Sequence, residues 1–199
     1  MKLEKADLEE LYLTKLMSAQ QIAISKGVSM HKVNYWLDKY SIKRRTISEA
    51  IYTWHHPDGD PFRFTQPVTK EDYELWGLGI ALYWGEGNKA NKNSVKIGNS
   101  DPGVIIVFMK FLDRFFQVGK GSLKFQLHLF SDLDLNKVRK FWENTLGVYS
   151  EQFYKPTVTI TGKLGTYRKK SEYGVVTLYY ANTKVRNILV DSIAVLAQW

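Results

Sequence analysis

Between Tyr73 and Gly87 the sequence places small residues four positions apart, at Gly77, Ala81 and Gly85. On an α-helix this spacing brings all three to one face. Each glycine inside a soluble helix costs about 1 kcal/mol relative to alanine, so the pattern needs a compensating contact. Small residues let two helix backbones approach closely. We therefore expect a helix whose small face packs against another helix, while a neighbouring face fills the core with Leu75, Leu78 and Leu82.

An acidic residue, Glu86, stands where this helix is expected to end, and Gly87 suits the C′ position after it. Free carbonyls and the negative end of the helix dipole disfavour a carboxylate there. A bound cation would remove that conflict. Carboxylate and backbone carbonyl oxygens are ligands of the kind that Mg²⁺ prefers, so Glu86 and the adjoining backbone at Gly85 form a candidate metal site.

The segment LGIALYWGEG at 78–87 resembles the signature helix of the LAGLIDADG homing endonuclease family. Ala81 and Gly85 stand at its small packing positions and Glu86 at its acidic position. The sequence VKIGNSDPGVIIVFMKFLDRFF at 95–116 resembles the strand and second helix of that family.

The resemblance covers roughly residues 70–199 and implies a function. In that family the acidic residue binds the catalytic divalent metal, and two motif helices pack together so that both acids meet at the cleavage site. This chain holds one such motif. The resemblance therefore implies a homodimer with Glu86 as the catalytic metal ligand, and with an interface at Gly77, Ala81 and Gly85.

The remainder of the C-terminal half alternates between strand and helix patterns. LKFQLHLF at 123–130 alternates apolar and polar residues, which predicts a half-buried strand. Three further inward pairs mark strands, namely Val95 with Ile97, Val158 with Ile160, and Val176 with Leu178. Apolar residues at helical spacing mark helices around 105–115, 138–146 and 185–196. We predict an α+β domain with helices packed on one face of a mainly antiparallel sheet.

The opposite face of that sheet is expected to be polar and cationic, which suits duplex DNA. It would present Lys96, Lys124, Gln126, His128, Lys155, Thr157 and Thr159. Any one-sided antiparallel sheet alternates in this way, but the net charge favours the functional interpretation. A basic loop at the expected hairpin tip would extend the phosphate contacts with Arg168, Lys169 and Lys170.

The first 52 residues have the spacing of a helix-turn-helix unit. Leu8, Leu11, Tyr12 and Leu16 fall at helical spacing. In the next two helices, Ser18 and Gln21 form a capping box, Ala23 is small where the helices cross, Gly27 can take the positive φ of the turn, and Ser29 caps the third helix. Residues 53–69, with three of the five prolines, are predicted to be a linker to the domain at 70–199.

The third helix and the basic run after it are candidates for DNA contact. The residues expected to contact DNA are Ser29, His31, Lys32, Asn34 and Tyr35, followed by Lys43, Arg44 and Arg45 near phosphates. The alternative is a three-helix bundle that only solubilises or docks, with the basic run as a solvated face.

Composition narrows the classes of function. Lys and Arg total 28 against 20 Asp and Glu, a net charge of +8, and the pI of about 9.4 favours a polyanionic partner. The absence of cysteine excludes disulfides, thiol nucleophiles and zinc fingers. No phosphate-cradling Gly-rich loop is present, which disfavours a nucleotide cofactor. No signal peptide or membrane span is evident, so we expect a cytoplasmic protein that joins the nucleoid when bound to DNA.

The sequence thus predicts a site-specific, Mg²⁺-dependent double-stranded DNA endonuclease. Two alternatives stay open: a transcription regulator that only binds DNA, and an RNA-binding maturase-type protein. The resemblance also implies a basic residue that assists near the phosphate, but no motif fixes it, and Lys96 and Lys155 are guesses from the polar face. His55, His56, Asp58 and Asp60 are interpreted as part of a turn-rich connector rather than as metal ligands.

Overall fold

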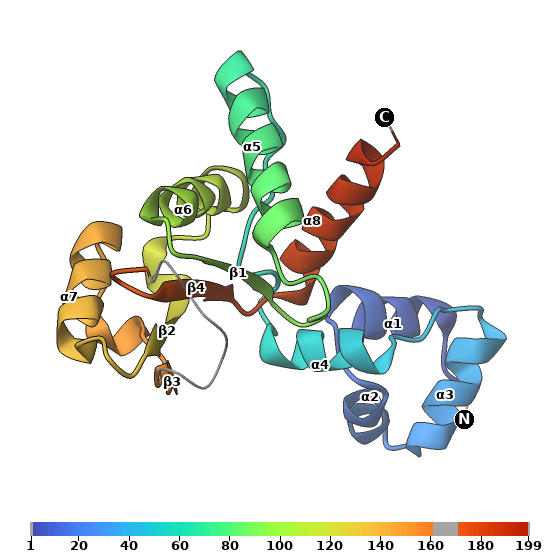
Figure 1. Ribbon diagram of the computed structural model, residues 1–199. Helices are drawn as coiled ribbons and strands as arrows, with labels where there is room; N and C mark the ends of the chain where they lie inside the picture. Colours follow the sequence, from blue (N-terminus) through green and yellow to red (C-terminus); the bar gives the residue numbers. More distant parts are fainter. Residues whose placement is uncertain (1, 161–170, 199) are drawn as a thin grey trace. The chain divides into compact units, whose positions relative to one another are not determined.

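A computed structural model describes residues 2–160 and 171–198. Within these residues the fold is α+β, with eight α-helices and a four-stranded mixed sheet (Figure 1). The chain divides into two compact units, residues 1–61 and 62–199. The division falls inside the stretch predicted as a linker. Among the described residues, no helix is long and apolar enough to cross a bilayer.

The first three helices of the N-terminal unit enclose a small core. Helix α1 (Lys5–Glu9) continues into a π-helical turn (Glu10–Thr14), followed by α2 (Ala19–Lys26) and α3 (Met30–Lys39). The helical spacing does not extend to Leu16, which lies after the π-helical turn and has a left-handed φ of 54°. Buried apolar residues from all three helices, the π-helical turn and the adjoining segments form one cluster of Leu3, Leu8, Tyr12, Ile22, Ala23, Val33, Leu37 and Ile42.

A fourth helix, α4 (Ile47–His55), was not predicted and extends into the stretch expected to be a linker. Thr46 and Glu49 form a capping box at its start. This T-x-x-E pattern was a helix signal in the sequence. None of its residues is buried, so the core pattern that marks the other helices is missing here.

The C-terminal unit is built on a sheet with strand order β1-β4-β2-β3. Strands β1 (Val95–Asn99) and β2 (Lys124–Phe130) both pair antiparallel with β4 (Val175–Tyr180), whereas β3 (Thr157–Thr159) runs parallel to β2. Because β3 and β4 are not neighbours, the expectation of a hairpin between them is wrong. Arg168, Lys169 and Lys170 lie outside the described residues.

Four helices share one apolar core with the inward side chains of this sheet. They are α5 (Lys70–Glu86), α6 (Pro102–Phe116), α7 (Leu135–Leu146) and α8 (Thr183–Leu196). The predicted alternation of β2 is confirmed, since Phe125, Leu127 and Leu129 are buried. On the edge strand β3, Val158 pairs with Leu129 but is 50% exposed, and Ile160 is also exposed. These two residues do not join the predicted core because no strand lies beyond β3 in the described sheet.

Helix α5 is anchored to α6 through a buried carboxylate near its first turn. Asp72 accepts hydrogen bonds from Nε of Arg114 at 2.8 Å and from its terminal nitrogen at 2.6 Å. Burial by itself raises the pKa of Asp72, but hydrogen bonds from Arg114 and from two backbone N–H groups outweigh it and leave that pKa lowered. The anchor ties the first turn of α5 to α6, at the end of the helix opposite to Glu86.

Candidate nucleic-acid interface and acidic helix end

The turn between α2 and α3 has the caps that the sequence predicts. The Ser18 hydroxyl accepts from the backbone N–H of Gln21 at 3.2 Å, and the backbone N–H of Ser18 donates to Oε1 of Gln21 at 2.8 Å. Gly27 has a φ of 62°, and the Ser29 hydroxyl accepts from the backbone of Lys32 at 3.2 Å. These contacts confirm the predicted caps and turn. Each could be predicted because its partners lie within a few positions in the sequence.

Helix α3 turns a mixed face toward solvent. His31 is exposed and Tyr35 is 54% exposed, while Lys32 and Asn34 are half-buried. The Lys39 ammonium lies 4.8 Å from the ring centroid of Trp36. The exposed face therefore carries an imidazole and a phenol, with an amide and an ammonium partly accessible beside them.

The three residues of the basic run have different environments. Lys43 is exposed and makes no hydrogen bond or ion pair within the described residues. Arg44 pairs with Asp38, with Nε 3.0 Å from the carboxylate. Arg45 was expected to lie near phosphates, and its guanidinium contacts other residues of the N-terminal unit.

The guanidinium of Arg45 lies 4.3 Å from the Tyr12 ring centroid. It donates to the carbonyls of Leu16, at 2.8 Å, and Met17. Its backbone N–H also donates to the Tyr12 hydroxyl at 2.9 Å. Arg45 therefore donates to two backbone carbonyls that follow the π-helical turn.

The second candidate surface is the sheet face opposite the core, which we name the outer sheet face. It consists of Lys96, Lys124, Gln126, His128, Thr157, Thr177 and Tyr179. Tyr179 pairs with both Lys96 and Lys124, and Gln126 pairs with Thr177. Lys155 precedes β3 and is exposed, while Thr159 pairs with Phe130 at the end of that strand.

Hydrogen bonds fix the centre of the outer sheet face. The Tyr179 hydroxyl donates to Oε1 of Gln126 at 2.8 Å, and Nε2 of Gln126 donates to the Lys155 carbonyl at 3.1 Å. Nε2 also lies 3.3 Å from the Thr157 hydroxyl oxygen. Both the oxygen and the nitrogen of the Gln126 amide, which was predicted to contact DNA, therefore have partners within the sheet. Burial and the neighbouring Tyr154 raise the pKa of Tyr179, so its hydroxyl keeps the proton that it donates.

The charges on this face come from its lysines. The Lys96 ammonium lies 5.0 Å from the Tyr179 ring centroid, and the Lys124 ammonium donates to the Glu151 carbonyl at 3.2 Å. Burial lowers the pKa of His128 below its usual 6.5, so this imidazole is neutral at pH 7. The outer sheet face therefore combines two ammonium groups with neutral hydrogen-bonding groups.

Helix α5 ends at Glu86, and the residues after it run along the edge strand β1. Gly87 forms an antiparallel bridge with Ile97, and the Asn88 backbone N–H donates to the Lys96 carbonyl at 2.9 Å. Glu86 is exposed and makes no hydrogen bond or ion pair within the described residues. Glu86 therefore lies next to the edge of the sheet that β1 forms, and its carboxylate has no partner among the described residues.

Gly87 follows the helix for a reason other than the predicted one. Its φ is −76°, so no left-handed conformation is required. A Cβ at this position would instead overlap the carbonyl oxygen and the ring of Tyr83. Close approach, not positive φ, requires the glycine.

The negative end of α5 receives a cation from the chain itself. The Lys89 ammonium donates to the Trp84 carbonyl at 2.5 Å, within the last turn of the helix. The Lys89 ammonium therefore partly compensates the negative end of the helix dipole, which had been the electrostatic reason to expect a metal there.

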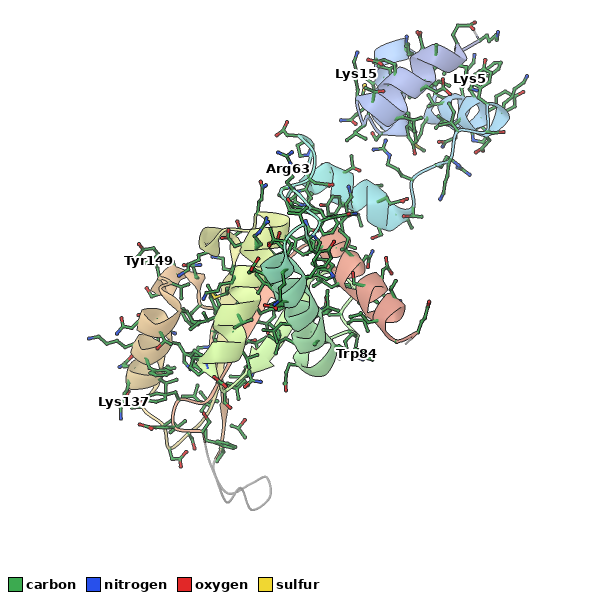
Figure 2. All side chains as sticks on the ribbon, turned by 90° about the horizontal axis from the view of Figure 1, so that it is seen from above. Lys5, Lys15, Arg63, Trp84, Lys137 and Tyr149 are labelled. Carbon is green, nitrogen blue, oxygen red and sulfur yellow. The ribbon has the colours of Figure 1, made fainter. Side chains whose placement is uncertain are left out.

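The small face of α5 is open. Gly77, Ala81 and Gly85 are exposed, and a Cβ added at either glycine would meet no other atom within 4 Å. Trp84, labelled in Figure 2, is 46% exposed near the end of the helix.

The glycine that packs closely inside the unit is a different one. A Cβ at Gly79 would overlap the Phe111 ring on α6. Leu75 and Leu82 pack against the core as predicted, but Leu78 is 47% exposed, so its assignment to the core is wrong. It lies beside the small face and adds apolar area to it.

The donor set suits a divalent metal only as half of a site. Among the described residues there is no group of three or more His, Asp or Glu side chains placed so that they could hold a metal. The residues from His55 to Asp60 do not form such a group either. Glu86 offers one free carboxylate, with backbone carbonyls nearby. A complete shell for Mg²⁺ would need a second chain or substrate phosphates.

Two residues that position this region were missed. Arg186 on α8 donates to the carbonyls of Lys89 and Asn91, and Tyr179 orients Gln126. Nothing in the sequence indicated that Tyr179 and Gln126 are partners. Arg186 falls on the polar side of an amphipathic helix and carried no distinguishing pattern.

No family model matches the chain, and no curated protein or solved structure matches it significantly.

Proposed function

We propose that this protein is a site-specific, Mg²⁺-dependent double-stranded DNA endonuclease that acts as a homodimer. The observation that carries the proposal is the Glu86 carboxylate, which has no hydrogen-bond or ion-pair partner among the described residues. It stands at the end of a helix with an exposed small face, and the next residue, Gly87, bridges to the edge strand β1. The resemblance of residues 78–87 to the LAGLIDADG motif supports the same function.

DNA binding is assigned to two surfaces. On the outer sheet face, Lys96 and Lys124 would contact phosphates. On α3, His31, Asn34 and Tyr35 have the hydrogen-bonding groups to read base edges, as the second helix of a helix-turn-helix unit does. Lys43 and Arg44 would contact phosphates next to it.

Dimerisation is assigned to the small face of α5. A two-fold pair is the simplest closed assembly, and Gly77, Ala81 and Gly85 are accessible to a second copy. Their lack of bulk lets two α5 helices approach closely, with Leu78 and Trp84 adding apolar area. Such packing would bring the two Glu86 carboxylates together.

In the dimer, the paired Glu86 carboxylates would hold the divalent metal at the scissile phosphates. A metal bound there activates water and stabilises the leaving oxygen. The ammonium groups of Lys96 and Lys124 would hold the DNA backbone across the sheet. Asn88, bonded to the backbone of β1, fixes the helix end relative to these lysines.

A DNA-binding transcription regulator is the second candidate. Two observations favour it: Lys89 already places a cation at the helix end, and each chain offers a single acid there. The same surfaces would bind DNA, and Glu86 would have no chemical role.

One experiment separates the two candidate functions. The protein is incubated with a randomised duplex library, with and without Mg²⁺, and both the bound molecules and the newly formed ends are sequenced. The endonuclease predicts recurrent ends at one sequence, formed only with Mg²⁺. Enrichment of a bound sequence without new ends would identify the regulator. Absence of both ends and enrichment would overturn the assignment to duplex DNA.

A further inference from the structure

The loop from Asn88 to Asn93 connects Glu86 to β1, and it is held from within and from one neighbouring helix. Oδ1 of Asn91 accepts from the backbone N–H groups of Asn93 and Ser94, each at 3.0 Å. Oδ1 of Asn88 accepts from the Asn91 backbone at 3.1 Å. The loop is therefore a compact turn in which movement of one residue displaces the others.

Arg186 on α8 supplies the contact from outside the loop. Its Nε donates to the Asn91 carbonyl at 3.1 Å, and a terminal nitrogen donates to the Lys89 carbonyl at 2.5 Å. These bonds join residues 95 and 97 positions apart in the chain. One planar guanidinium thus bridges two carbonyls of the turn, which an ammonium group cannot do with the same geometry.

The helix that carries Arg186 is itself firmly placed. Asn182 is buried and caps its start by accepting from the backbone of Val185 at 2.9 Å. Val185 and Leu189 are fully buried in the core on either side of Arg186 in sequence. The arginine therefore projects from a fixed backbone.

The contacts continue from the loop to the end of α5. Lys89, whose carbonyl Arg186 holds, donates its ammonium to Trp84 two residues before Glu86. Arg186 also faces the buried Tyr83. Burial raises the pKa of that phenol, and the positive charge of Arg186 acts against the shift.

We propose that Arg186 is a positioning residue for Glu86: by holding the carbonyls of Lys89 and Asn91, it fixes the loop that sets the place of the acidic helix end beside β1. The inference rests on the proposed nuclease function. Arg186 itself contacts neither metal nor DNA in this proposal. Its loss would leave Glu86 present but free to move away from the geometry that two paired carboxylates need.

Three variants test the proposal: Arg186→Gln, Arg186→Lys and Arg114→Gln. Arg114 is the matched control, because it anchors the opposite end of the same helix through Asp72. Each variant is assayed for thermal stability, for affinity to the selected duplex in EDTA, and for the Mg²⁺ concentration that gives half-maximal cleavage.

Arg186→Gln is expected to raise that Mg²⁺ concentration by about tenfold, the order seen when a residue that orients metal ligands is removed. DNA affinity in EDTA should stay within about twofold of wild type. Arg114→Gln should lower the melting temperature and leave the Mg²⁺ dependence unchanged. If Arg186→Gln does not fold, Arg186→Lys decides, with a smaller shift in the same direction.

An Arg186 variant that folds and keeps the wild-type Mg²⁺ dependence overturns the inference while the nuclease stands. An equal shift in Arg114→Gln also overturns it, because the effect would then be general loosening of α5. A wild-type protein that binds the duplex but never cleaves it removes the proposed function first, and the inference with it.

Discussion

At the residue scale, side chains that look equivalent in the sequence differ in charge on the outer sheet face. Lys96 and His128 both alternate with buried residues on their strands. Burial lowers the pKa of His128, so protonation requires a pH below the usual 6.5. At neutral pH only the lysine adds positive charge toward a polyanion.

This difference can be measured from the salt dependence of DNA binding at pH 7.5. Replacing a lysine that contacts a phosphate reduces the slope of log affinity against log salt by about 0.9. We expect Lys96→Gln to show this reduction and His128→Gln to leave the slope unchanged. An equal reduction in both variants would contradict the assignment of His128 as neutral.

A second prediction concerns Arg45, whose bonds to Leu16 and Met17 are internal. Arg45→Ala removes two charged hydrogen bonds and the contact with the Tyr12 ring. We expect the N-terminal unit to lose about 2 kcal/mol of unfolding free energy, measured by denaturant unfolding.

The matched comparison is the double variant Lys43→Ala and Arg44→Ala, which should keep its stability and lose DNA affinity on all sequences. If Arg45→Ala is as stable as wild type, the internal role is incorrect. An unchanged salt slope in the double variant would remove the basic run from the interface.

Residue roles were predictable where the partner is close in sequence. Ser18, Gly27 and Ser29 act as the cap and turn residues expected of them, since each acts within a few positions. The tertiary partners of Arg45 and Gln126 lie about 28 to 53 positions away. Nothing in a local pattern identifies such partners.

At the scale of elements, α5 carries glycines with opposite roles. Gly79 packs against the Phe111 ring, whereas Gly77 faces open space. The sequence placed the close packing on the face of Gly77, because spacing shows which residues share a face but not which face meets the core.

The two glycines predict opposite effects on stability. Gly79→Ala forces a methyl group into the Phe111 ring and should cost about 1–3 kcal/mol. Gly77→Ala should raise the stability of the protomer by up to about 1 kcal/mol, through helix propensity. Thermal unfolding at low protein concentration measures both. A stabilised Gly79→Ala protein would show that α5 and α6 are further apart than described.

The order of elements was largely predictable, and their connections were not. Strong periodicity marked β2, α6, α7 and α8 because each buries one face in a common core. Helix α4 buries nothing and so lacked that pattern. The parallel pairing of β3 with β2 depends on chain direction in space, which alternation does not encode.

At the scale of the whole molecule, the proposed nuclease requires two copies of the chain. In the proposed nuclease, one Glu86 per chain would give half of a metal site, and the exposed small face of α5 would give the second copy a place to bind. Ala81→Leu would separate the two helices without disturbing the protomer, since Ala81 is exposed.

We therefore expect wild type to sediment as a dimer and Ala81→Leu as a folded monomer that no longer cleaves. Circular dichroism checks that the variant is folded. A wild-type monomer that cuts both strands would contradict the inference that a chain with one motif must act as a dimer.

The most direct test of the central claim is cleavage of a supercoiled plasmid that carries the selected site, in the presence of Mg²⁺. Wild type should linearise it. Glu86→Gln, which keeps the shape and removes the charge, should bind the site with unchanged affinity and leave the plasmid intact. Full cutting by Glu86→Gln would contradict the role of Glu86, and a wild type that binds without cutting would identify the protein as the regulator instead.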